Sequence, residues 1–347
     1  HSVVSLHGAG VYGSKLRDIG VNVETLDMPR GRLKFNGLWR LRKIILGYSP
    51  DIIHTKLYHA DLVGGVVALL SGAPPVIWTV NSSDLGKLRN SWKTRFIRRI
   101  CAILSYGIPS AIIADANNTK RVNVSLGYSP KKFFVINNGI DLSSFFPDQR
   151  ARQRLRHEFQ IQEDVVLLGF IARWDPLKDH SNLLQALSII KNNNRKFACI
   201  LVGNDMSSQN SVLMELIHKN ELDDHIILPG PRSDIPAIMN ALDLHVLSSF
   251  SESMPLAIIE AMACGTPCVV TDVGDAALVV GDTGWVVPPK EPNALAAGIE
   301  TGIGALEKNG KVELGQRCRR IIEEKYSLEA MVDSYIKIWG ETVARFE

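Results

Sequence analysis

Short apolar runs alternate with helical patterns along nearly the whole chain, and they do so in two successive sets. The runs of the first set are His1–Leu6, Val21–Leu26, Asp51–Thr55, Val76–Val80, Ala111–Ala114 and Phe133–Ile136. Those of the second set are 165–172, 197–203, 225–229, 243–248, 268–273 and 285–287. Strands that alternate with helices form parallel sheets with helices on both faces. The sequence therefore predicts an α/β protein with two doubly wound, Rossmann-like domains.

A polar and charged stretch that ends near residue 163 separates the two sets. The chain of 347 residues is also longer than one hydrophobic core usually serves. We therefore predict a first domain over residues 1–148, a second over 149–326, and a final amphipathic helix within 327–347. Ligands of doubly wound sheets bind beyond the carboxyl ends of the strands. Two such domains predict a ligand-binding cleft where these strand ends face each other.

The composition is that of a soluble globular protein, with 46% hydrophobic and 22% charged residues. No apolar run approaches the length of about 18 residues that indicates a transmembrane helix. The five cysteines form no Cys-x-x-Cys pair and have no histidine nearby at zinc-ligand spacing. We therefore expect neither a metal site nor disulfides, and a reducing, cytoplasmic compartment.

The segment Glu252–Pro267 carries the strongest signal of function. It lies between two apolar runs, which predicts the order strand, loop, helix, strand. Pro255 suits the first turn of the helix, because its missing N–H costs nothing there. Ser253 is suited to cap the start of this helix and Gly265 to close its end.

Two carboxylates occupy different depths of this predicted helix. The N-terminus of a helix attracts phosphate, because its free N–H groups carry partial positive charge. Glu260 lies about 9 Å beyond Met254 along the helix, where it could bind a ribose diol. Glu252 lies at the mouth of the helix, where it could bind sugar hydroxyl groups. This spacing predicts a nucleotide-sugar site.

The same segment resembles glycosyltransferase family four (group 1), whose members are retaining enzymes with the GT-B fold. The usual family pattern is Glu-Gly-x-Pro, four residues, and Glu-Ala-Met-x-x-Gly-x-Pro-Val. The matching residues are Glu252, Pro255, Glu260, Ala261, Met262, Gly265 and Pro267. The chain departs from the pattern at Ser253 and Cys268. The resemblance implies a GT-B fold in which two Rossmann-like domains face a cleft and the last helix returns to the first domain. It also implies donor contacts from Glu260 and from Ser253, Met254, Pro255 and Leu256.

Two cations follow the apolar run 165–172. Arg173 and Lys178 are suited to clamp a diphosphate and to offset negative charge on the leaving group. The family has Gly-Arg, four residues and Lys-Gly at this point, so the resemblance supports both cations, although both glycines are replaced here. In the family, the loops after the next two strands hold the nucleotide base. The resemblance therefore implicates Gly203 and Arg232 in donor binding.

The sequence contains no Asp-x-Asp motif, which holds a metal ion on the diphosphate in transferases of the other large fold. Arg173, Lys178 and the helix N-terminus can balance that charge instead. We therefore expect no metal and no cofactor, with the nucleotide-sugar as a substrate. The resemblance implies that the departing β-phosphate takes the acceptor's proton, without a protein nucleophile. Glu252 would orient the sugar, which makes it a catalytic residue together with the two cations.

The segment Leu57-Tyr-His59-Ala-Asp61 resembles a subgroup of the family that builds bacterial lipopolysaccharide, O-antigen and capsule sugars. The resemblance implicates His59 and Asp61, at the start of a helix, in acceptor binding. After the run 76–80 the family usually has a histidine near the sugar, where this chain has Asn81 and Ser82. Either side chain can bind a hydroxyl group, but neither titrates near neutral pH. The implied acceptor is a lipid-linked or polysaccharide glycan.

Positive charge is concentrated in the first domain. Residues 1–148 hold 19 Lys and Arg against 9 Asp and Glu, whereas the remainder holds 20 against 27. Two of its segments, 30–43 and 87–99, combine cations with Trp39, Trp92 and Phe96. Such segments on helices suit an anionic membrane surface, although ordinary solvated helix faces have the same composition. Because no nucleic-acid-binding motif is present, we expect a peripheral location on the inner face of the cytoplasmic membrane and no nucleic-acid partner.

The chain begins at His1 within an apolar run, whereas family members open with an earlier strand, a Gly-rich loop and a helix. The resemblance therefore predicts a first domain that lacks its first, central strand and has two unpaired sheet edges. The function predicted is transfer from a UDP-hexose or UDP-N-acetylhexosamine during synthesis of a cell-surface glycan. Two alternatives stay open: a non-catalytic homologue that binds sugar nucleotides, favoured by Asn81 and Ser253, and a GT-B epimerase of UDP-sugars.

Overall fold

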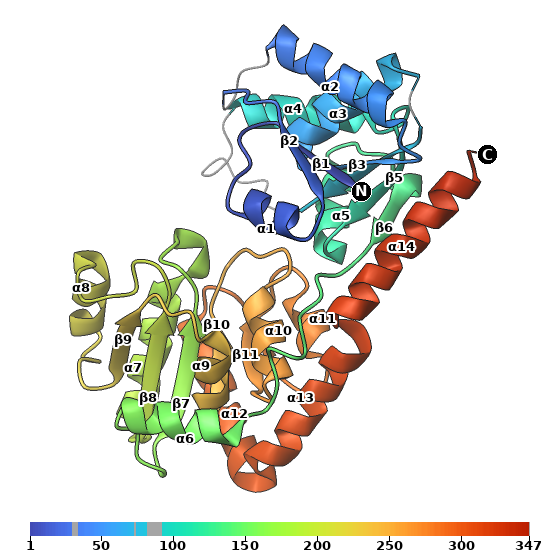
Figure 1. Ribbon diagram of the computed structural model, residues 1–347. Coiled ribbons are helices and arrows are strands. Elements are labelled where there is room, and N and C mark those ends of the chain that lie inside the picture. Colours follow the sequence, from blue (N-terminus) through green and yellow to red (C-terminus); the bar gives the residue numbers. More distant parts are fainter. Residues whose placement is uncertain (30–33, 73, 82–91, 347) are drawn as a thin grey trace. The chain divides into compact units, whose positions relative to one another are not determined.

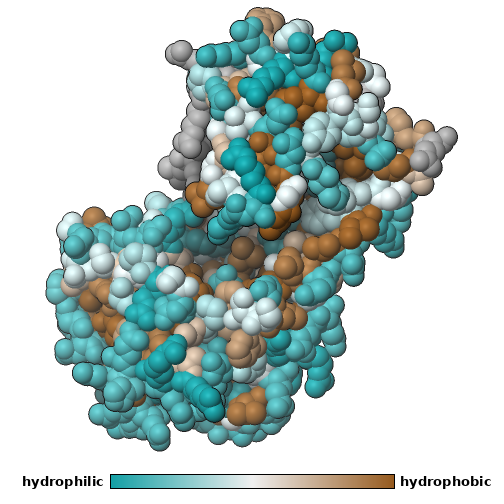
Figure 2. Space-filling model, in the orientation of Figure 1, coloured by the Kyte–Doolittle hydropathy of each residue, from teal (hydrophilic) through white to brown (hydrophobic). Residues whose placement is uncertain are grey.

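A computed structural model describes residues 1–29, 34–72, 74–81 and 92–346 (Figure 1). The chain forms two compact units. The N-terminal unit comprises His1–Asp115, Thr119–Ile136 and Ser334–Glu347, and the C-terminal unit comprises Ala116–Asn118 and Asn137–Asp333. Figure 2 shows that hydrophilic residues cover much of the visible surface, with hydrophobic patches on both units.

The boundary between the units falls after Ile136, earlier than the predicted position at residue 148. The physical reason lies in the apolar residues of the intervening segment. Ile140 belongs to a core cluster of the C-terminal unit, and Leu142 and Phe145 pack against the same cluster. The linker therefore folds with the second unit.

Parallel strands form two sheets in the N-terminal unit. In one, β1 (Ser2–Ser5) pairs with β2 (Asn22–Thr25). The order in the other is β3 (Ile53–Lys56), β4 (Val76–Val80), β5 (Pro109–Ala114) and β6 (Phe133–Val135). The helices are α1 (Tyr12–Asp18), α2 (Phe35–Tyr48), α3 (Tyr58–Leu70), α4 (Trp92–Leu104) and α5 (Asn117–Ser125). β1 and β3 thus each have one hydrogen-bonded neighbour among the described strands.

Helix α3 packs closely on this four-stranded sheet because two glycines face it. A Cβ atom on Gly64 would lie 2.7 Å from Thr55 Cγ2, and one on Gly65 would lie 3.1 Å from Trp78 Nε1. Trp78 itself is fully buried in β4. Larger residues at these two positions would push the helix outward.

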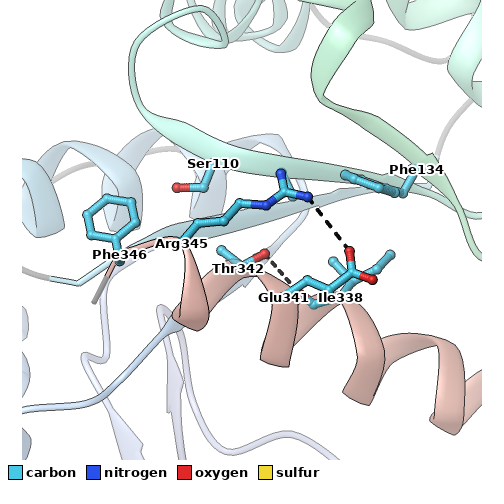
Figure 3. A pocket seen from close by; sticks show the side chains of 8 residues that line it. Ser110, Phe134, Ile338, Glu341, Thr342, Arg345 and Phe346 are labelled. Carbon is cyan, nitrogen blue, oxygen red and sulfur yellow. Dashed lines mark hydrogen bonds and ion pairs between the residues drawn. The ribbon is translucent and has the colours of Figure 1, made fainter.

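The final helix, α14 (Leu328–Ala344), begins in the C-terminal unit, and its second half belongs to the N-terminal unit. Within that unit, Trp339 donates from Nε1 to His54 Nδ1 over 3.3 Å, and the ring of Tyr335 lies 5.8 Å from that of His54. Since Nδ1 accepts, the opposite nitrogen carries the proton and donates to Thr79 Oγ1 over 2.6 Å. Figure 3 shows the last turns of α14 beside Ser110 of β5, where a surface cavity of about 150 Å³ lies.

The C-terminal unit contains one six-stranded parallel sheet in the order β12-β11-β10-β7-β8-β9. Its strands are β7 (Val166–Ile171), β8 (Phe197–Val202), β9 (Ile226–Gly230), β10 (Leu244–Leu247), β11 (Cys268–Thr271) and β12 (Trp285–Val287). Its helices are α6 (Gln149–Glu158), α7 (His180–Asn192), α8 (Ser211–Lys219), α9 (Ile235–Ala241), α10 (Leu256–Ala263), α11 (Ala276–Val280), α12 (Pro292–Asn309) and α13 (Lys311–Lys325).

Alternate residues of the central strands enter different cores. Leu167 and Ile200 belong to one core cluster, whereas their neighbours Leu168 and Leu201 belong to another. Successive residues of a strand point to opposite faces of a sheet, so both faces of this sheet are covered. The predicted α/β architecture with doubly wound parallel sheets is confirmed.

The strand order places a switch point between β7 and β10. From β7 the chain continues through β8 to β9 on one side, and it then returns to β10 on the other side. In doubly wound sheets the crevice at such a point, beyond the carboxyl ends of the strands, binds ligands. The loops that follow β7 and β10 are therefore the expected position of a ligand-binding site.

In the described parts of the chain, none of the helices combines the length and hydrophobicity needed to cross a bilayer.

Candidate active site

The loop after β7 carries Arg173 and Lys178. Asp175 shapes this loop, because its carboxylate accepts from the backbone N–H of Leu177 over 3.0 Å at the start of a short 3-10 turn. The same carboxylate accepts from Arg173 Nη2 over 2.7 Å. Arg173 is thus oriented by Asp175, which lies between the two predicted cations but has no role that their motif predicts. The Arg173 side chain remains about half exposed and is available to a ligand.

Lys178 lies at the end of this turn and pairs with Glu252, which follows β10. The distance from Lys178 Nζ to Glu252 Oε1 is 2.5 Å, and Ser249 Oγ donates to the same carboxylate oxygen over 2.7 Å. Both side chains of the ion pair are largely buried. The structure therefore brings two of the predicted catalytic residues together at the switch point of the sheet.

The loop that carries Glu252 is held by a glycine on the following loop. A Cβ atom on Gly274 would lie 2.6 Å from the backbone oxygen of Glu252, and the backbone N–H of Asp275 donates to Ser253 O over 3.0 Å. Gly274 also has a φ of +59°, which disfavours other residues. Only a glycine lets these two loops approach so closely, and no motif in the sequence indicates this position.

Helix α10 begins one residue later than predicted. Pro255 is its N-cap residue, with an extended backbone, and Leu256 is the first helical residue. The prediction that Ser253 caps this helix is wrong, since the helix has no side-chain cap hydrogen bond. Gly265 ends the helix as predicted, with a φ of +75° and its N–H donating to Met262 O. Met254, just before the helix, is buried in the core.

Glu260 lies in the second turn of α10 and is partly buried. Burial raises the pKa of its carboxyl group. Within the described part of the chain, no side chain forms an ion pair or hydrogen bond with this carboxyl group. A carboxyl group in such surroundings is stabilised when a ligand supplies hydrogen-bond donors to it.

The other two predicted donor residues have structural partners. A Cβ atom on Gly203 would lie 2.9 Å from the backbone nitrogen of Arg173, so the absence of a side chain allows the loops after β7 and β8 to touch. Arg232 donates to Asp234 from Nε and Nη2 and to Glu158 from Nη1, over 2.7–2.8 Å. The guanidinium group of Arg232 is thus committed to two carboxylates.

On the N-terminal unit, His59 and Asp61 lie in the first turn of α3 but face different ways. His59 is exposed. Asp61 is fully buried and accepts from Thr55 Oγ1 over 2.6 Å. The prediction that both residues contact an acceptor is therefore wrong for Asp61. The reason is helical spacing, because Asp61 shares the sheet-facing side of α3 with Gly64 and Gly65.

Asn81 directly follows β4 and is partly buried, and its side-chain oxygen has no hydrogen-bond partner in the part of the chain that the structure describes. Ser82 lies outside the described residues. No group of three or more His, Cys, Asp or Glu residues that could hold a metal ion occurs among the described residues.

Comparisons with known proteins identify the family. Residues 151–325 match the family model "Glycosyl transferases group 1", and residues 2–144 match "Glycosyltransferase Family 4". One similar protein is the UDP-Gal:alpha-D-GlcNAc-diphosphoundecaprenol alpha-1,3-galactosyltransferase of Escherichia coli, which is 26% identical over 87% of this chain and 78% of its own length. Another is the N-acetyl-alpha-D-glucosaminyl L-malate synthase of Bacillus anthracis, 26% identical over 84% of this chain and 74% of its own length.

Solved structures show the same architecture. The complex of Anabaena HepE with UDP-glucose superposes with a TM-score of 0.81 at 22% identity, over 98% of this chain and 91% of that chain. The lipopolysaccharide outer core galactosyltransferase WaaB superposes with a TM-score of 0.71 at 14% identity, over 98% of this chain and 99% of that chain. This chain belongs to the group 1 glycosyl transferases (family 4), and it has their GT-B fold.

Proposed function

We propose that this glycosyltransferase retains the anomeric configuration and moves a hexose or N-acetylhexosamine from a UDP-sugar to a lipid-linked or polysaccharide acceptor. The observation that carries the proposal is the carboxyl group of Glu260. It is partly buried, has a raised pKa and has no side-chain partner among the described residues. A ribose diol would supply the two hydrogen-bond donors that this group lacks.

The diphosphate of the donor would bind between the two cations of the β7 loop and the start of α10. Arg173 is half exposed, and Lys178 forms an ion pair with Glu252 at the switch point of the sheet. Their charges would stabilise the negative charge that develops on the departing diphosphate. This arrangement supports a reaction without a metal ion. The nucleotide-sugar is a substrate, and we propose no cofactor.

Glu252 would orient the transferred sugar. It is fixed by Lys178 and by Ser249, so its carboxylate presents a defined hydrogen-bonding edge to sugar hydroxyl groups. No side chain is needed as a nucleophile, because the departing β-phosphate can accept the acceptor's proton on the face from which it leaves. His59 and Asn81 are the residues we assign to the acceptor side.

The acceptor proposal has support from relatives. The similar Escherichia coli enzyme is named for a diphosphoundecaprenol acceptor, which is a lipid-linked sugar. An acceptor of this kind would place the reaction at the inner face of the cytoplasmic membrane. It would belong to the synthesis of a cell-surface glycan such as lipopolysaccharide, O-antigen or capsule.

The test compares Glu260→Ala with Glu215→Ala, which removes an exposed carboxylate from α8. Loss of the ribose contact should lower kcat/KM by a factor that corresponds to about 2–4 kcal/mol, with unfolding by urea unchanged. Glu215→Ala should keep full activity, and EDTA should not alter the rate of any variant. Donor turnover by Glu260→Ala at the normal rate would contradict the assignment of Glu260 to the ribose of the donor.

Two further outcomes separate the alternatives. A chain that binds UDP with no sugar transfer and no donor hydrolysis would be a non-catalytic homologue. Interconversion of UDP-N-acetylhexosamines without an acceptor would indicate an epimerase. Product analysis by NMR would distinguish both from transfer, and it would also report whether the anomeric configuration is retained.

A further inference from the structure

The outward side of α2 carries large apolar residues in a regular row. Phe35 is 90% exposed and Trp39 59% exposed, and Leu46 follows on the same side. The opposite side of the helix, which includes Leu41 and Ile45, is buried in a core cluster of the N-terminal unit. Helix α2 is therefore apolar on two sides, and among the described residues only one of these sides packs into a core.

Helix α4 repeats this arrangement at the same spacing. Trp92 is 67% exposed and Phe96 59% exposed, and Ile103 is exposed on the same side. Cys101 and Ala102 face inward and are buried. In both helices an aromatic residue is followed by a second aromatic residue four positions later, and an aliphatic residue lies seven positions beyond the second.

The two helices lie in one layer of the N-terminal unit, because α3 packs against both of them (Figure 1). At the end of α3, Leu69 and Leu70 are also exposed. We name the exposed residues Phe35, Trp39 and Leu46 of α2 and Trp92, Phe96 and Ile103 of α4, together with the exposed cations of both helices, the basic-aromatic face.

The charge of this face has one sign. Neither α2 nor α4 contains Asp or Glu. The exposed cations are Arg40, Arg42 and Lys43 on α2 and Lys93, Arg95 and Arg99 on α4. Arg40 pairs with Glu24 over 3.5 Å, but no ion pair of the other five with a carboxylate is found among the described residues.

The cations and the aromatic rings lie together. Lys43 Nζ lies 3.7 Å from the centre of the Trp39 ring, and Lys93 Nζ lies 5.8 Å from that of Trp92. An aromatic ring beside a cation on an amphipathic helix is typical of residues at the boundary between lipid headgroups and acyl chains. A purely solvated face gains nothing from keeping such large apolar groups in water.

The charge also decides between possible partners. A second copy of this face would bring unpaired cations against one another, which is unfavourable. An anionic bilayer offers opposite charge to the cations and an apolar interior to the rings. We propose that the basic-aromatic face docks on anionic lipid, with Phe35, Trp39, Trp92 and Phe96 inserted at the headgroup boundary. The inference rests on the proposed function for its biological setting, since a lipid-linked acceptor requires such a contact.

The experiment measures sedimentation of the full chain with vesicles of phosphatidylglycerol and phosphatidylcholine in equal parts, and with phosphatidylcholine alone. The aromatic variant is Trp39→Ala with Phe96→Ala, and the charge variant is Arg42→Gln, Lys43→Gln, Arg95→Gln and Arg99→Gln. The control variant removes the exposed cations Lys308 and Lys325 of the C-terminal unit. UDP affinity is measured for every variant by titration.

The unmodified chain should bind the anionic vesicles and not phosphatidylcholine, with affinity that falls as salt is added. The charge variant should bind about 600-fold more weakly, because each of its four lost cations contributes about fivefold. The aromatic variant should also bind at least about tenfold more weakly, and its residual binding should be more sensitive to salt. The control should bind as the unmodified chain does.

Absence of vesicle binding, or equal binding by all variants, would overturn the inference. Concentration-dependent dimerisation that the aromatic variant abolishes, without vesicle binding, would assign the face to a second copy of the chain instead. UDP affinity should be the same in every variant. A variant that changes vesicle binding but not UDP affinity therefore tests the basic-aromatic face. Failure of the unmodified chain to bind UDP would instead count against the proposed function.

Discussion

Lys178 and Glu252 illustrate what the sequence could predict about single residues. Each was identified from its own motif, but their ion pair joins loops after two strands that are neighbours only in the folded sheet. Asp61 shows the reverse case, because its motif suggested acceptor binding whereas the rotation of α3 buries its side chain. Local spacing can thus identify the chemical type of a residue, but the direction of a side chain depends on packing elsewhere.

The Lys178–Glu252 pair leads to a first prediction at this scale. Lys178→Met keeps the aliphatic stem but removes the charge that balances both the diphosphate and the largely buried Glu252. We expect kcat/KM to fall by about 10²–10³-fold, with a loss of about 1–3 kcal/mol in the free energy of unfolding. Steady-state kinetics and urea unfolding measure the two effects. Lys191→Met on α7, which removes a cation paired with the exposed Glu221, should leave the kinetics unchanged, and an equal loss in both variants would contradict the assignment.

His245 allows a prediction about pH. It is fully buried on β10, and neither ring nitrogen has a hydrogen-bond partner among the described residues. Burial, and to a lesser extent the charge of Lys178, lowers the pKa of His245 from 6.5 to about 3. The unfolded chain therefore binds a proton as the pH falls through 6.5, while the folded chain does not until about pH 3. The stability contributed by the neutral ring is present above pH 6.5 and decreases between these two values.

The matching variant is His245→Phe, which fills a similar volume without titrating. Between pH 7 and pH 4.5, the free energy of unfolding of the variant should decrease by about 2–3 kcal/mol less than that of the unmodified chain. Urea unfolding at the two pH values measures this difference. His157→Gln, which replaces an exposed histidine of α6, should follow the unmodified chain. Parallel curves for all three proteins would show that His245 does not titrate between the folded and unfolded states.

At the scale of helices and strands, the apolar strands were predictable because each is a short run between polar segments. The sequence does not predict helix α6, since this stretch is mostly charged and is typical of a linker. The helix forms because Asp148 caps its first turn and because Ala151 and Leu155, on one side, reach the core. Arg152 and Arg156 then pair with Asp243, which lies just before β10. Contacts this distant in sequence leave no local signal.

The contact between two loops gives the prediction at this scale. Gly274→Ala places a methyl group against the backbone oxygens of Glu252 and Ser253 at a φ of +59°. The loop that carries Glu252 should shift, so kcat/KM should fall by about tenfold or more, and stability by about 1–3 kcal/mol. Kinetics and urea unfolding again measure both effects.

The control is Gly304→Ala in the helix α12, where no atom lies within 4 Å of the added Cβ. This substitution should increase stability by about 0.5–1 kcal/mol, because alanine is the better helix former, and should leave activity unchanged. Full activity of Gly274→Ala would mean that the position of the Glu252 loop does not matter for transfer.

At the scale of the whole molecule, the number of domains and their α/β class followed from the alternation of strands and helices. The boundary after Ile136 did not, because it depends on which core receives Ile140, Leu142 and Phe145. The order of the strands within each sheet was also beyond the sequence, whereas the resemblance to the family does predict the separation of the first sheet at a missing central strand. Strands of similar composition form a continuous six-stranded sheet in one unit and two separate sheets in the other.

This difference in sheets predicts that the two units open with different free energies. In the C-terminal unit, β7, β8 and β10 each have two hydrogen-bonded neighbours, and every residue of β8 is buried. In the N-terminal unit, β1 and β2 pair only with each other among the described strands. A two-stranded sheet is marginally stable by itself, because few of its hydrogen bonds are shielded from water.

Amide hydrogen exchange, read by mass spectrometry, should therefore be fastest in β1 and β2, intermediate in β4 and β5, and slowest in β7, β8 and β10. Donor binding should slow exchange in the C-terminal unit further, since a ligand stabilises the state that binds it. Equal protection of β1 and β8 would show that the two-stranded sheet is stabilised as strongly as the central sheet, which its hydrogen bonding does not explain.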